Sequence, residues 1–519
     1  MMAPRNCLVP LIGLVAASCS DKGQERPNIL YVFPDQFRAS AMAFWDRPEF
    51  AGAQRWKADP VVTPVLDRFA GESLVLTRAV SNCPLSSPYR GMFLTGMFPE
   101  RNGIISNCMA LRPDNTLDPD ATCISDVLSA SGYQCAYIGK LHADAPTRND
   151  PANPGHFVSD RDPEWDAYTP PERRHGFEYW YSYGTFDQHK NPHYWDTEGV
   201  RHDPGVFSVQ HESDKAVEFL RSRDKKRPFF LCVAYNPPHS PYLRPQEDCL
   251  IQDYAHYAGM GLDELYVRPN ADTTMAKAPS ARIYFANVTA VDRGFGRILQ
   301  ELKRQGLDRN TIVVFTADHG ETMCSHSTED PKNSIWTESF NVPFLIRWPG
   351  HVPPAVDSLL LSTVDIMPTL LTMAGLEVPQ SVEGHDRSSI FLGRGGERPS
   401  AALYLRNVNG DPDPDGLYRH FFPVARGVKT DRYTFEIALC RDYTVDTVSI
   451  YDDWVDPYQM HCLDWRENGP LLRSLLDILA EKLRESDDVW QRDGILDRVA
   501  AQLHPLCSTA DCSTGRQAL

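Results

Sequence analysis

The stretch from residue 81 to residue 96 reads Ser81-Asn-Cys-Pro-Leu-Ser86-Ser-Pro88-Tyr-Arg90-Gly-Met-Phe-Leu-Thr-Gly96. Small and polar residues lead to Pro88, and an apolar run then ends at Gly96. Proline is favoured in the first turn of a helix and glycine just after the last turn, so the pattern predicts a short helix that begins near Pro88. Ser86 then lies at the helix N-terminus, where backbone N–H groups favour negative charge, and Arg90 adds a cation one turn along. The stretch predicts an anion site that contains a hydroxyl group.

The pattern Ser86-x-Pro88-x-Arg90 with a Leu-Thr-Gly ending resembles the signature of the formylglycine-dependent sulfatases. In that family the first residue is oxidised to an aldehyde (formylglycine, or 3-oxoalanine), hydrated to a geminal diol and used as the nucleophile on sulfate. This position holds Ser86 and not cysteine, and Cys83 lies three residues too early to fit. The resemblance therefore implies the serine-type maturation of bacteria, carried out by a radical maturing enzyme. Taken alone, the residues also permit a serine N-cap before an ordinary helix.

Apolar runs alternate with helical patterns along the chain, which is typical of a mostly parallel α/β sheet. The predicted strands are 28–33, 74–77, 133–138, 228–235 and 311–316. The predicted helices are 64–70, 124–130, 209–223 and 281–304. The sulfatase resemblance implies the same fold class: α/β, with an alkaline-phosphatase-like large sheet flanked by helices and a smaller C-terminal α+β domain.

Polar groups follow four of the predicted strands directly after the last apolar residue. In open α/β sheets ligands bind outside the carboxyl ends of the strands, so these groups are expected to converge at one edge together with Ser86. The converging set is Asp35, Gln36, Lys140, His142, His239, Asp318 and His319. One polar strand end is often a solvated loop, but four in register with this mix of side chains indicate a site.

Three residues of this set, Asp35, Gln36 and Asp318, offer hard oxygen ligands, which suit Ca²⁺ or Mg²⁺ better than a soft metal. The resemblance implies that they bind Ca²⁺ together with His319 and an oxygen of residue 86. Many relatives carry a second Asp where Gln36 stands, so this site has one negative charge fewer. His319 is either a ligand or an orienting neighbour, because calcium prefers oxygen.

Three further segments match sulfatase patterns. They are Gly139-Lys140-Leu141-His142, in which leucine replaces the usual tryptophan, Asn236-Pro-Pro-His239, and Lys332-x3-Trp336-x-Glu338. The resemblance implies that Lys140, His239 and Lys332 neutralise the sulfate oxygens. It also implies that Arg90 supports the nucleophile, that His239 protonates the leaving sugar oxygen, and that His142 takes the proton whose loss expels sulfate.

Composition excludes some classes of partner. The chain has 519 residues, a formal net charge of −17 and no basic tract, which argues against nucleic acid. The 13 cysteines include no metal-type Cys-x-x-Cys pair. Cys507 and Cys512 are close enough in sequence to form a disulfide, but the pairing cannot be derived from spacing alone.

Residues 1–19 have the features of an export signal: Arg5, an apolar stretch from Leu8 to Ala17, and small residues before Cys19. The stretch is too short to span a bilayer. It resembles a lipoprotein signal with Cys19 as the lipidated residue; plain secretion is the alternative. We therefore expect a bacterial periplasmic or cell-surface protein, attached to the membrane only through a lipid at Cys19.

The mature chain is long enough for two domains. We expect a catalytic α/β domain over 26–392 and a smaller domain over 393–519, which begins near a Gly-rich loop. In the second domain, 426–435 and 448–451 are predicted strands, and 471–483 is a predicted amphipathic helix.

Together these features predict a sulfatase that acts on sulfated carbohydrates. The segment 186–195 is rich in hydrogen-bonding and aromatic groups, as sugar sites often are, although a structured surface loop is an equal alternative. Two other functions remain open: a phosphatase or phosphodiesterase of the same fold that uses unmodified Ser86, and a non-catalytic glycan-binding protein. The residues do not identify the sugar or the sulfated hydroxyl.

Overall fold

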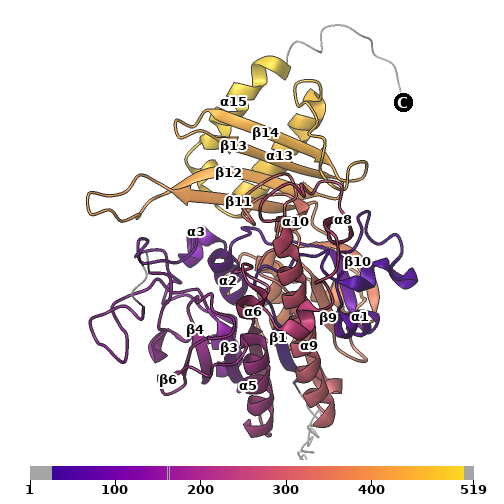
Figure 1. The fold of residues 1–519 in the computed structure, drawn as a ribbon. Coiled ribbons are helices and arrows are strands. Elements are labelled where there is room, and N and C mark those ends of the chain that lie inside the picture. Colours follow the sequence, from indigo (N-terminus) through magenta and orange to yellow (C-terminus); the bar gives the residue numbers. More distant parts are fainter. Residues whose placement is uncertain (1–25, 160–161, 163, 508–519) are drawn as a thin grey trace, which may run out of the picture.

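The computed structural model describes residues 26–159, 162 and 164–507. The predicted export signal with Cys19 lies outside the described residues. The disulfide considered between Cys507 and Cys512 also lies outside them, because neither side chain is described. Figure 1 shows a large body of sheet and helices, built by the first part of the chain, and a smaller antiparallel sheet stacked on it. In the described part of the chain, no helix combines the length and the apolar character needed to cross a membrane.

The large sheet has the strand order β10-β2-β9-β8-β1-β7-β3-β4-β5-β6. Its centre is formed by β8 (Thr311–Thr316), β1 (Asn28–Val32), β7 (Phe229–Ala234) and β3 (Gln134–Lys140), which all run parallel. The outer strands are β2 (Leu74–Ala79), β4 (Tyr179–Tyr183), β5 (Tyr194–Asp196), β6 (Arg201–His202), β9 (Phe344–Arg347) and β10 (Ala355–Leu361). Among the described strands of this sheet, only β5 and β9 are antiparallel to the others. The mostly parallel sheet is therefore confirmed.

Helices cover the sheet because its central strands are buried on both faces. One group consists of α1 (Pro64–Gly71), α5 (Ser208–Ser222) and α9 (Ala281–Arg304), and Phe69 of α1 meets Phe295 of α9 edge-on at 5.0 Å between ring centroids. A second group consists of α2 (Ser86–Thr95), α4 (Ile124–Ala130) and α11 (Ile366–Met373). The short helices are α3 (Pro99–Asn102), α6 (Pro245–Asp248), α7 (Ile251–Tyr254), α8 (Leu262–Leu265), α10 (Thr337–Phe340) and α12 (Ser388–Phe391).

Helix α2 begins at Ser86, two residues before the predicted start at Pro88. The difference arises because the N–H groups of the whole first turn lack helical partners, so proline is tolerated at the third helical position as well as at the first. The helix ends as predicted at Gly96, which adopts φ 65° and donates its N–H to the carbonyl of Met92 at 2.8 Å.

The smaller sheet is antiparallel, in the order β11 (Ala401–Asn409), β12 (Phe421–Thr430), β13 (Tyr433–Leu439), β14 (Val445–Asp452). The single strand predicted over 426–435 is wrong, because the chain turns between β12 and β13. The Oγ1 of Thr430 accepts hydrogen bonds from the N–H groups of Arg432 and Tyr433, which closes this turn. The predicted strand 448–451 lies within β14.

Helix α13 (Gly469–Glu485) covers this sheet with the buried side chains of Leu472, Leu475 and Leu479, so the predicted amphipathic helix is confirmed. Two further helices, α14 (Val489–Arg492) and α15 (Ile495–Cys507), follow it. The division of the chain at residue 392 stays a prediction.

The smaller sheet also supports the loop that leads to Ser86. Cys83 and Met92 belong to the same apolar cluster as buried residues of the C-terminal sheet, among them Leu403. The Nδ2 of Asn82 donates to the Leu403 carbonyl at 2.7 Å. The position of α2 thus depends on residues more than 300 positions later in the chain.

Candidate active site

The polar residues that follow the four central strands meet around Ser86. They are Asp35 and Gln36 after β1, Lys140 and His142 at the end of β3, His239 after β7, and Asp318 and His319 after β8. All of them except His239 are buried. Arg90 reaches the same place from α2, and Lys332 reaches it from the loop before α10.

Ser86 is the first residue of α2 and is 1% exposed. Its Oγ lies 3.2 Å from Nε2 of His319 and 3.3 Å from Oδ1 of Asp35. The positive end of the helix dipole favours negative charge on this oxygen. The hydroxyl is therefore placed as a nucleophile or a ligand would be, at the centre of the predicted set.

Two cationic side chains, Lys140 and Arg90, hold Asp35. The Nζ of Lys140 lies 2.7 Å from Oδ2 of Asp35, and Nη2 of Arg90 lies 3.1 Å from the same oxygen. Burial works against the charged form, but the positive charge of Lys140 holds the pKa of Asp35 well below its ordinary value. Arg90 contacts this carboxylate and the Lys140 carbonyl, at 2.5 Å, and none of its described contacts is to Ser86.

The pKa of Asp318 shifts in the opposite direction to that of Asp35. Nη2 of Arg90 lies 3.0 Å from its Oδ2, yet burial and the negative charge of Asp35 raise the pKa of Asp318 above its ordinary value. Two buried carboxylates this close repel each other. A divalent cation between them would relieve that repulsion.

The donor set fits such a cation. Ligand atoms of Asp35, Asp318 and His319 lie within 4.8 Å of one another. Gln36 turns its Nε2 toward Tyr242 and the carboxylate of Glu321, while its Oε1 is buried without a hydrogen-bond partner among the described residues. A buried acceptor oxygen without a partner is costly unless a ligand satisfies it. Two carboxylates, an amide oxygen and an imidazole are suited to Ca²⁺ or Mg²⁺.

His319 presents a neutral imidazole to this set. Its Nδ1 donates to the Gly320 carbonyl at 2.9 Å, so Nε2 carries the lone pair that faces Ser86. Burial and the positive charge of Lys332 lower the pKa of His319 well below its ordinary value. A neutral imidazole is the form that binds a metal or accepts a proton.

His142 is also a neutral imidazole, but the donor and acceptor roles of its two ring nitrogens are the reverse of those in His319. Its Nε2 donates to the Cys108 carbonyl at 3.1 Å, and its Nδ1 is buried with no partner among the described residues. Burial, followed by the charges of Lys140 and Arg90, lowers the pKa of His142 well below its ordinary value. The side chain is thus a neutral base with a free lone pair.

His239 is flanked by charged groups on both ring nitrogens. Its Nε2 lies 3.0 Å from Nζ of Lys332, and its Nδ1 lies 3.3 Å from Oδ1 of Asp187 and 3.0 Å from the Ser240 carbonyl. Against the effect of burial, the charge of His239 holds the pKa of Asp187 well below its ordinary value. A carboxylate behind an imidazole stabilises the protonated ring, which suits a proton donor.

Asp187 and Glu321 are the two site residues that sequence reasoning did not single out. Asp187 lies in the 186–195 segment, whose polar composition was the available signal. Glu321 lies two residues after His319, and its contact with Gln36 could be found only from the fold.

The third sulfatase-like segment contains Lys332, and two of its other side chains make contacts of their own. The ring of Trp336 stacks on His326 at 4.2 Å between centroids, and Glu338 forms an ion pair with Arg268. Burial notwithstanding, Arg268 holds the pKa of Glu338 well below its ordinary value.

Comparison with known proteins identifies the family of this chain. The model of the Sulfatase family matches residues 27–376, and that of the N-sulphoglucosamine sulphohydrolase C-terminal region matches residues 326–487. An endo-4-O-sulfatase from Bacteroides thetaiotaomicron is 53% identical over 92% of this chain and 95% of its own length. An ulvan-active sulfatase from Formosa agariphila is 29% identical over 93% of this chain and 87% of its own length.

A solved structure, described under the metabolism of multiple glycosaminoglycans by Bacteroides thetaiotaomicron, superposes with a TM-score of 0.90 at 53% identity. The superposition covers 91% of this chain and 99% of that structure. The large mixed sheet with a smaller antiparallel sheet is thus the alkaline-phosphatase-like fold of the sulfatases. The chain belongs to the sulfatase family, and it is a sulfuric ester hydrolase.

Proposed function

We propose that this sulfatase acts on carbohydrates and removes 4-O-sulfate groups from within sulfated glycosaminoglycan chains. The relative that is 53% identical over nearly its whole length is an endo-4-O-sulfatase, and the similar solved structure is associated with glycosaminoglycan metabolism. They cover 92% and 91% of this chain, so they support the substrate class more strongly than a match of the catalytic core alone.

Ser86 is the nucleophile, after conversion to formylglycine. The observation that carries this assignment is the place of its Oγ, at the N-terminus of α2 and 3.2 Å and 3.3 Å from His319 and Asp35. The hydrated aldehyde supplies a second hydroxyl, whose loss of a proton releases sulfate without attack by water. A serine-competent maturing enzyme must act on the chain before it folds around Ser86, because the residue is 1% exposed.

Asp35, Gln36, Asp318 and His319 would hold Ca²⁺, or Mg²⁺ in its place. When bound, the ion would make the hydroxyl of residue 86 more acidic and balance the two buried carboxylates. Lys140 and Lys332 add positive charge for the sulfate oxygens. Lys140 is already oriented by Asp35 and, at 3.1 Å, by Oδ1 of Asn236.

The two histidines divide the proton transfers. His239, with Asp187 behind it, donates a proton to the sugar oxygen as its bond to sulfur breaks. His142, neutral and with Nδ1 free, accepts the proton from the second hydroxyl of residue 86 as the sulfate ester breaks down. Each role is inferred from the group that contacts the ring nitrogen not used for proton transfer. This group is the Asp187 carboxylate at Nδ1 of His239 and the Cys108 carbonyl at Nε2 of His142.

The protein is exported, and a lipid on Cys19 anchors it at the periplasmic face or cell surface; the sequence of residues 1–19 supports this. Export is consistent with a polymeric substrate, which does not enter the cytoplasm.

The test is sulfate release from a 4-O-sulfated glycosaminoglycan oligosaccharide, with the 6-O-sulfated isomer as the comparison substrate. Protein made together with a serine-competent maturing enzyme should desulfate the 4-O-sulfated sugar at internal positions, and protein made without that enzyme should be inactive. Mass spectrometry of the peptide that contains residue 86 should show the loss of two hydrogens in the active sample only. Activity of the unmodified protein, or preference for the 6-O-sulfated isomer, would overturn the nucleophile or the substrate assignment, respectively.

A further inference from the structure

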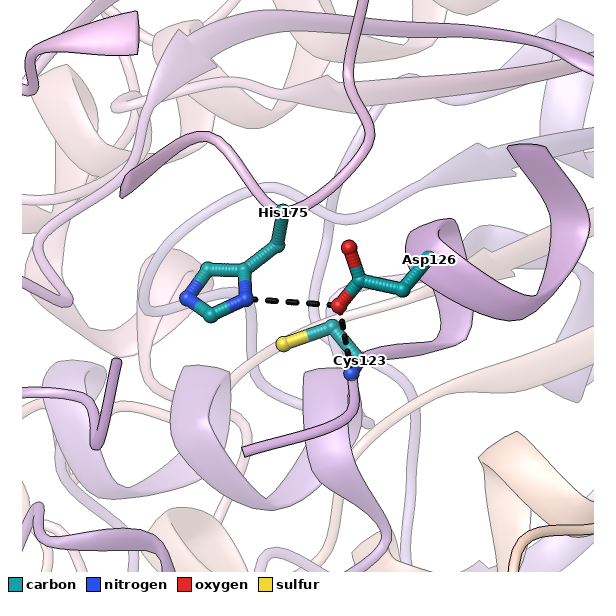
Figure 2. Close-up of side chains that lie close together, drawn as sticks. All are labelled: Cys123, Asp126 and His175. Atoms are coloured by element: carbon teal, nitrogen blue, oxygen red, sulfur yellow. Dashed lines mark hydrogen bonds and ion pairs between the residues drawn. The ribbon is translucent and has the colours of Figure 1, made fainter. Parts of the chain in front are cut away.

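A second set of metal-type donors lies outside the catalytic site. Cys123 directly precedes α4, Asp126 lies in the first turn of α4, and His175 follows the short helix η3 (Pro171–Arg173). One ligand atom from each of the three lies within 4.8 Å of the other two. Figure 2 shows the sulfur, the carboxylate and the imidazole turned toward a common point.

This cluster lies near the opposite end of β3 from the catalytic groups. The Sγ of Cys135, the second residue of β3, donates to the carbonyl of Ser125 in α4 at 3.6 Å, whereas Lys140 ends the same strand. The cluster is therefore separate from the candidate calcium site and shares no residue with it.

The spacing of the donors matches a tetrahedral ion. The Nδ1 of His175 and Oδ2 of Asp126 are 3.3 Å apart. Metal–nitrogen and metal–oxygen distances of about 2.0–2.2 Å place two ligands of a tetrahedral zinc ion about 3.3–3.5 Å apart. A Cys–His–Asp nucleophile would instead use the two different ring nitrogens for its two partners. In Figure 2 both partners lie on the Nδ1 side of the ring, and Nε2 has no hydrogen-bond partner among the described residues.

The three donors are held in place by the protein itself. The Oδ2 of Asp126 also accepts the N–H of Cys123 at 2.9 Å, which fixes the carboxylate beside the thiol. His175 adopts φ 43°, and a Cβ on the following Gly176 would lie 2.8 Å from the Ser125 carbonyl. The loop is thus pressed against α4. A site that is preorganised in this way needs little rearrangement to bind an ion.

We propose that Cys123, Asp126 and His175 bind Zn²⁺ in a structural site that joins the loop before β4 to α4. A sulfur, a nitrogen and an oxygen donor are suited to zinc, and not to the calcium that prefers oxygen alone. The thiolate and the carboxylate together balance the charge of the ion. The Asp126 side chain is 34% exposed, so water can reach the fourth position.

Binding replaces a proton. The Cys123 thiol is completely buried, and burial and the nearby Asp126 raise its pKa well above the ordinary value. The proton therefore leaves when the ion forms its bond to sulfur, and one proton is released to water for each ion bound.

The test uses Co²⁺ as a spectroscopic substitute for zinc in the full chain, after chelation and with excess Ca²⁺ present. A cobalt–thiolate bond gives a charge-transfer absorption in the near ultraviolet, and the ligands of the candidate calcium site include no thiol. We expect one equivalent of Co²⁺ to produce this absorption, Zn²⁺ to abolish it, and Cys123→Ser to lack it. The matched control Cys135→Ser removes a neighbouring buried thiol and should keep the absorption.

A second variant keeps the test valid in case Cys123→Ser does not fold. His175→Ala should weaken zinc binding by more than about tenfold, since even partners of ligands contribute 10–100-fold to metal affinity. Absence of the absorption in the wild type, or its persistence in Cys123→Ser, would overturn the site. Neither readout depends on sulfatase activity.

Discussion

At the scale of single residues, His142 and His239 differ in the partner of the ring nitrogen that faces away from the reaction. A backbone carbonyl accepts a hydrogen bond from His142, which fixes a neutral ring. A carboxylate and a carbonyl face Nδ1 of His239, and a carboxylate stabilises a charged ring. In the proposed mechanism, Cys108 and Asp187 thus set the chemistry of the two side chains and do not react themselves.

The division of roles predicts different losses on two substrates. His239→Ala should lose roughly 10²–10⁴-fold more activity on a sulfated sugar than on an aryl sulfate, because an aryl oxide leaves without protonation. His142→Ala should be impaired on both substrates and should accumulate protein that carries the mass of sulfate on the peptide containing residue 86. Rate ratios on the two substrates and one mass spectrum provide the measurement.

The control is His461→Ala, since the His461 side chain is 82% exposed and lies in the C-terminal part of the chain. It should keep wild-type rates on both substrates. Equal losses for His142→Ala and His239→Ala on both substrates, with no trapped sulfate, would contradict the assignment.

At the scale of elements, the loop between β4 and β5 acts as a support for the His239 loop. Asp187 faces the His239 ring, and Nε2 of His189 donates to the His239 carbonyl at 2.8 Å. The polar composition of 186–195 thus has a partly structural explanation. A direct role of this loop in sugar binding stays a prediction.

This support should be sensitive to acid. Burial lowers the pKa of His189 from 6.5 to about 4, and its Nδ1 has no partner among the described residues to accept a new proton. The unfolded chain therefore binds a proton more readily, and the free energy of unfolding falls as pH drops from about 6.5 to about 4. His189→Gln keeps an N–H donor and should remove up to about 3 kcal/mol of that fall. Urea unfolding at several pH values measures it.

The exposed His256, which forms no ion pair with a described carboxylate, provides the control. His256→Gln should leave the acid dependence of the wild type unchanged. An unchanged acid dependence in His189→Gln would show that other groups cause it.

Strand β3 depends on one glycine to deliver Lys140 and His142. Gly139 adopts φ 99°, and a Cβ there would lie 2.2 Å from the Ala234 carbonyl of β7. Gly139→Ala should push the two strands apart and lower the melting temperature. It should also reduce activity, because Lys140 is displaced. Gly71→Ala is the control, since no atom lies within 4 Å of its Cβ position. Melting curves and sulfate release measure both effects, and a wild-type melting temperature for Gly139→Ala would refute the argument.

At the scale of the whole molecule, the sequence predicted helices and strands better than it predicted side-chain contacts between separate segments. The strands 28–33 and 311–316 and the helices 124–130 and 281–304 agree with the structure because apolar periodicity and length specify them. The turn at Asp431 was missed, since it depends on a side-chain hydrogen bond of Thr430. Asp187 was missed as a partner of His239 because the two residues lie in different loops, which only the folded chain brings together.

The candidate calcium site connects three distant parts of the chain, so its occupancy should stabilise the molecule as a whole. Asp35 follows β1, residue 86 begins α2 and Asp318 follows β8, and without a cation the two carboxylates repel each other. An ion that binds only the folded state adds about 2.7 kcal/mol at a concentration 100 times its dissociation constant. The melting temperature should therefore rise with Ca²⁺ and fall on chelation. Asp318→Asn should lose activity, and its melting temperature should no longer respond to Ca²⁺ or chelator. Asp187→Asn, which removes a carboxylate from the same site but no ligand, should keep the full response to Ca²⁺. A melting temperature of the wild type that does not change with Ca²⁺ or chelator would show that these residues bind no calcium.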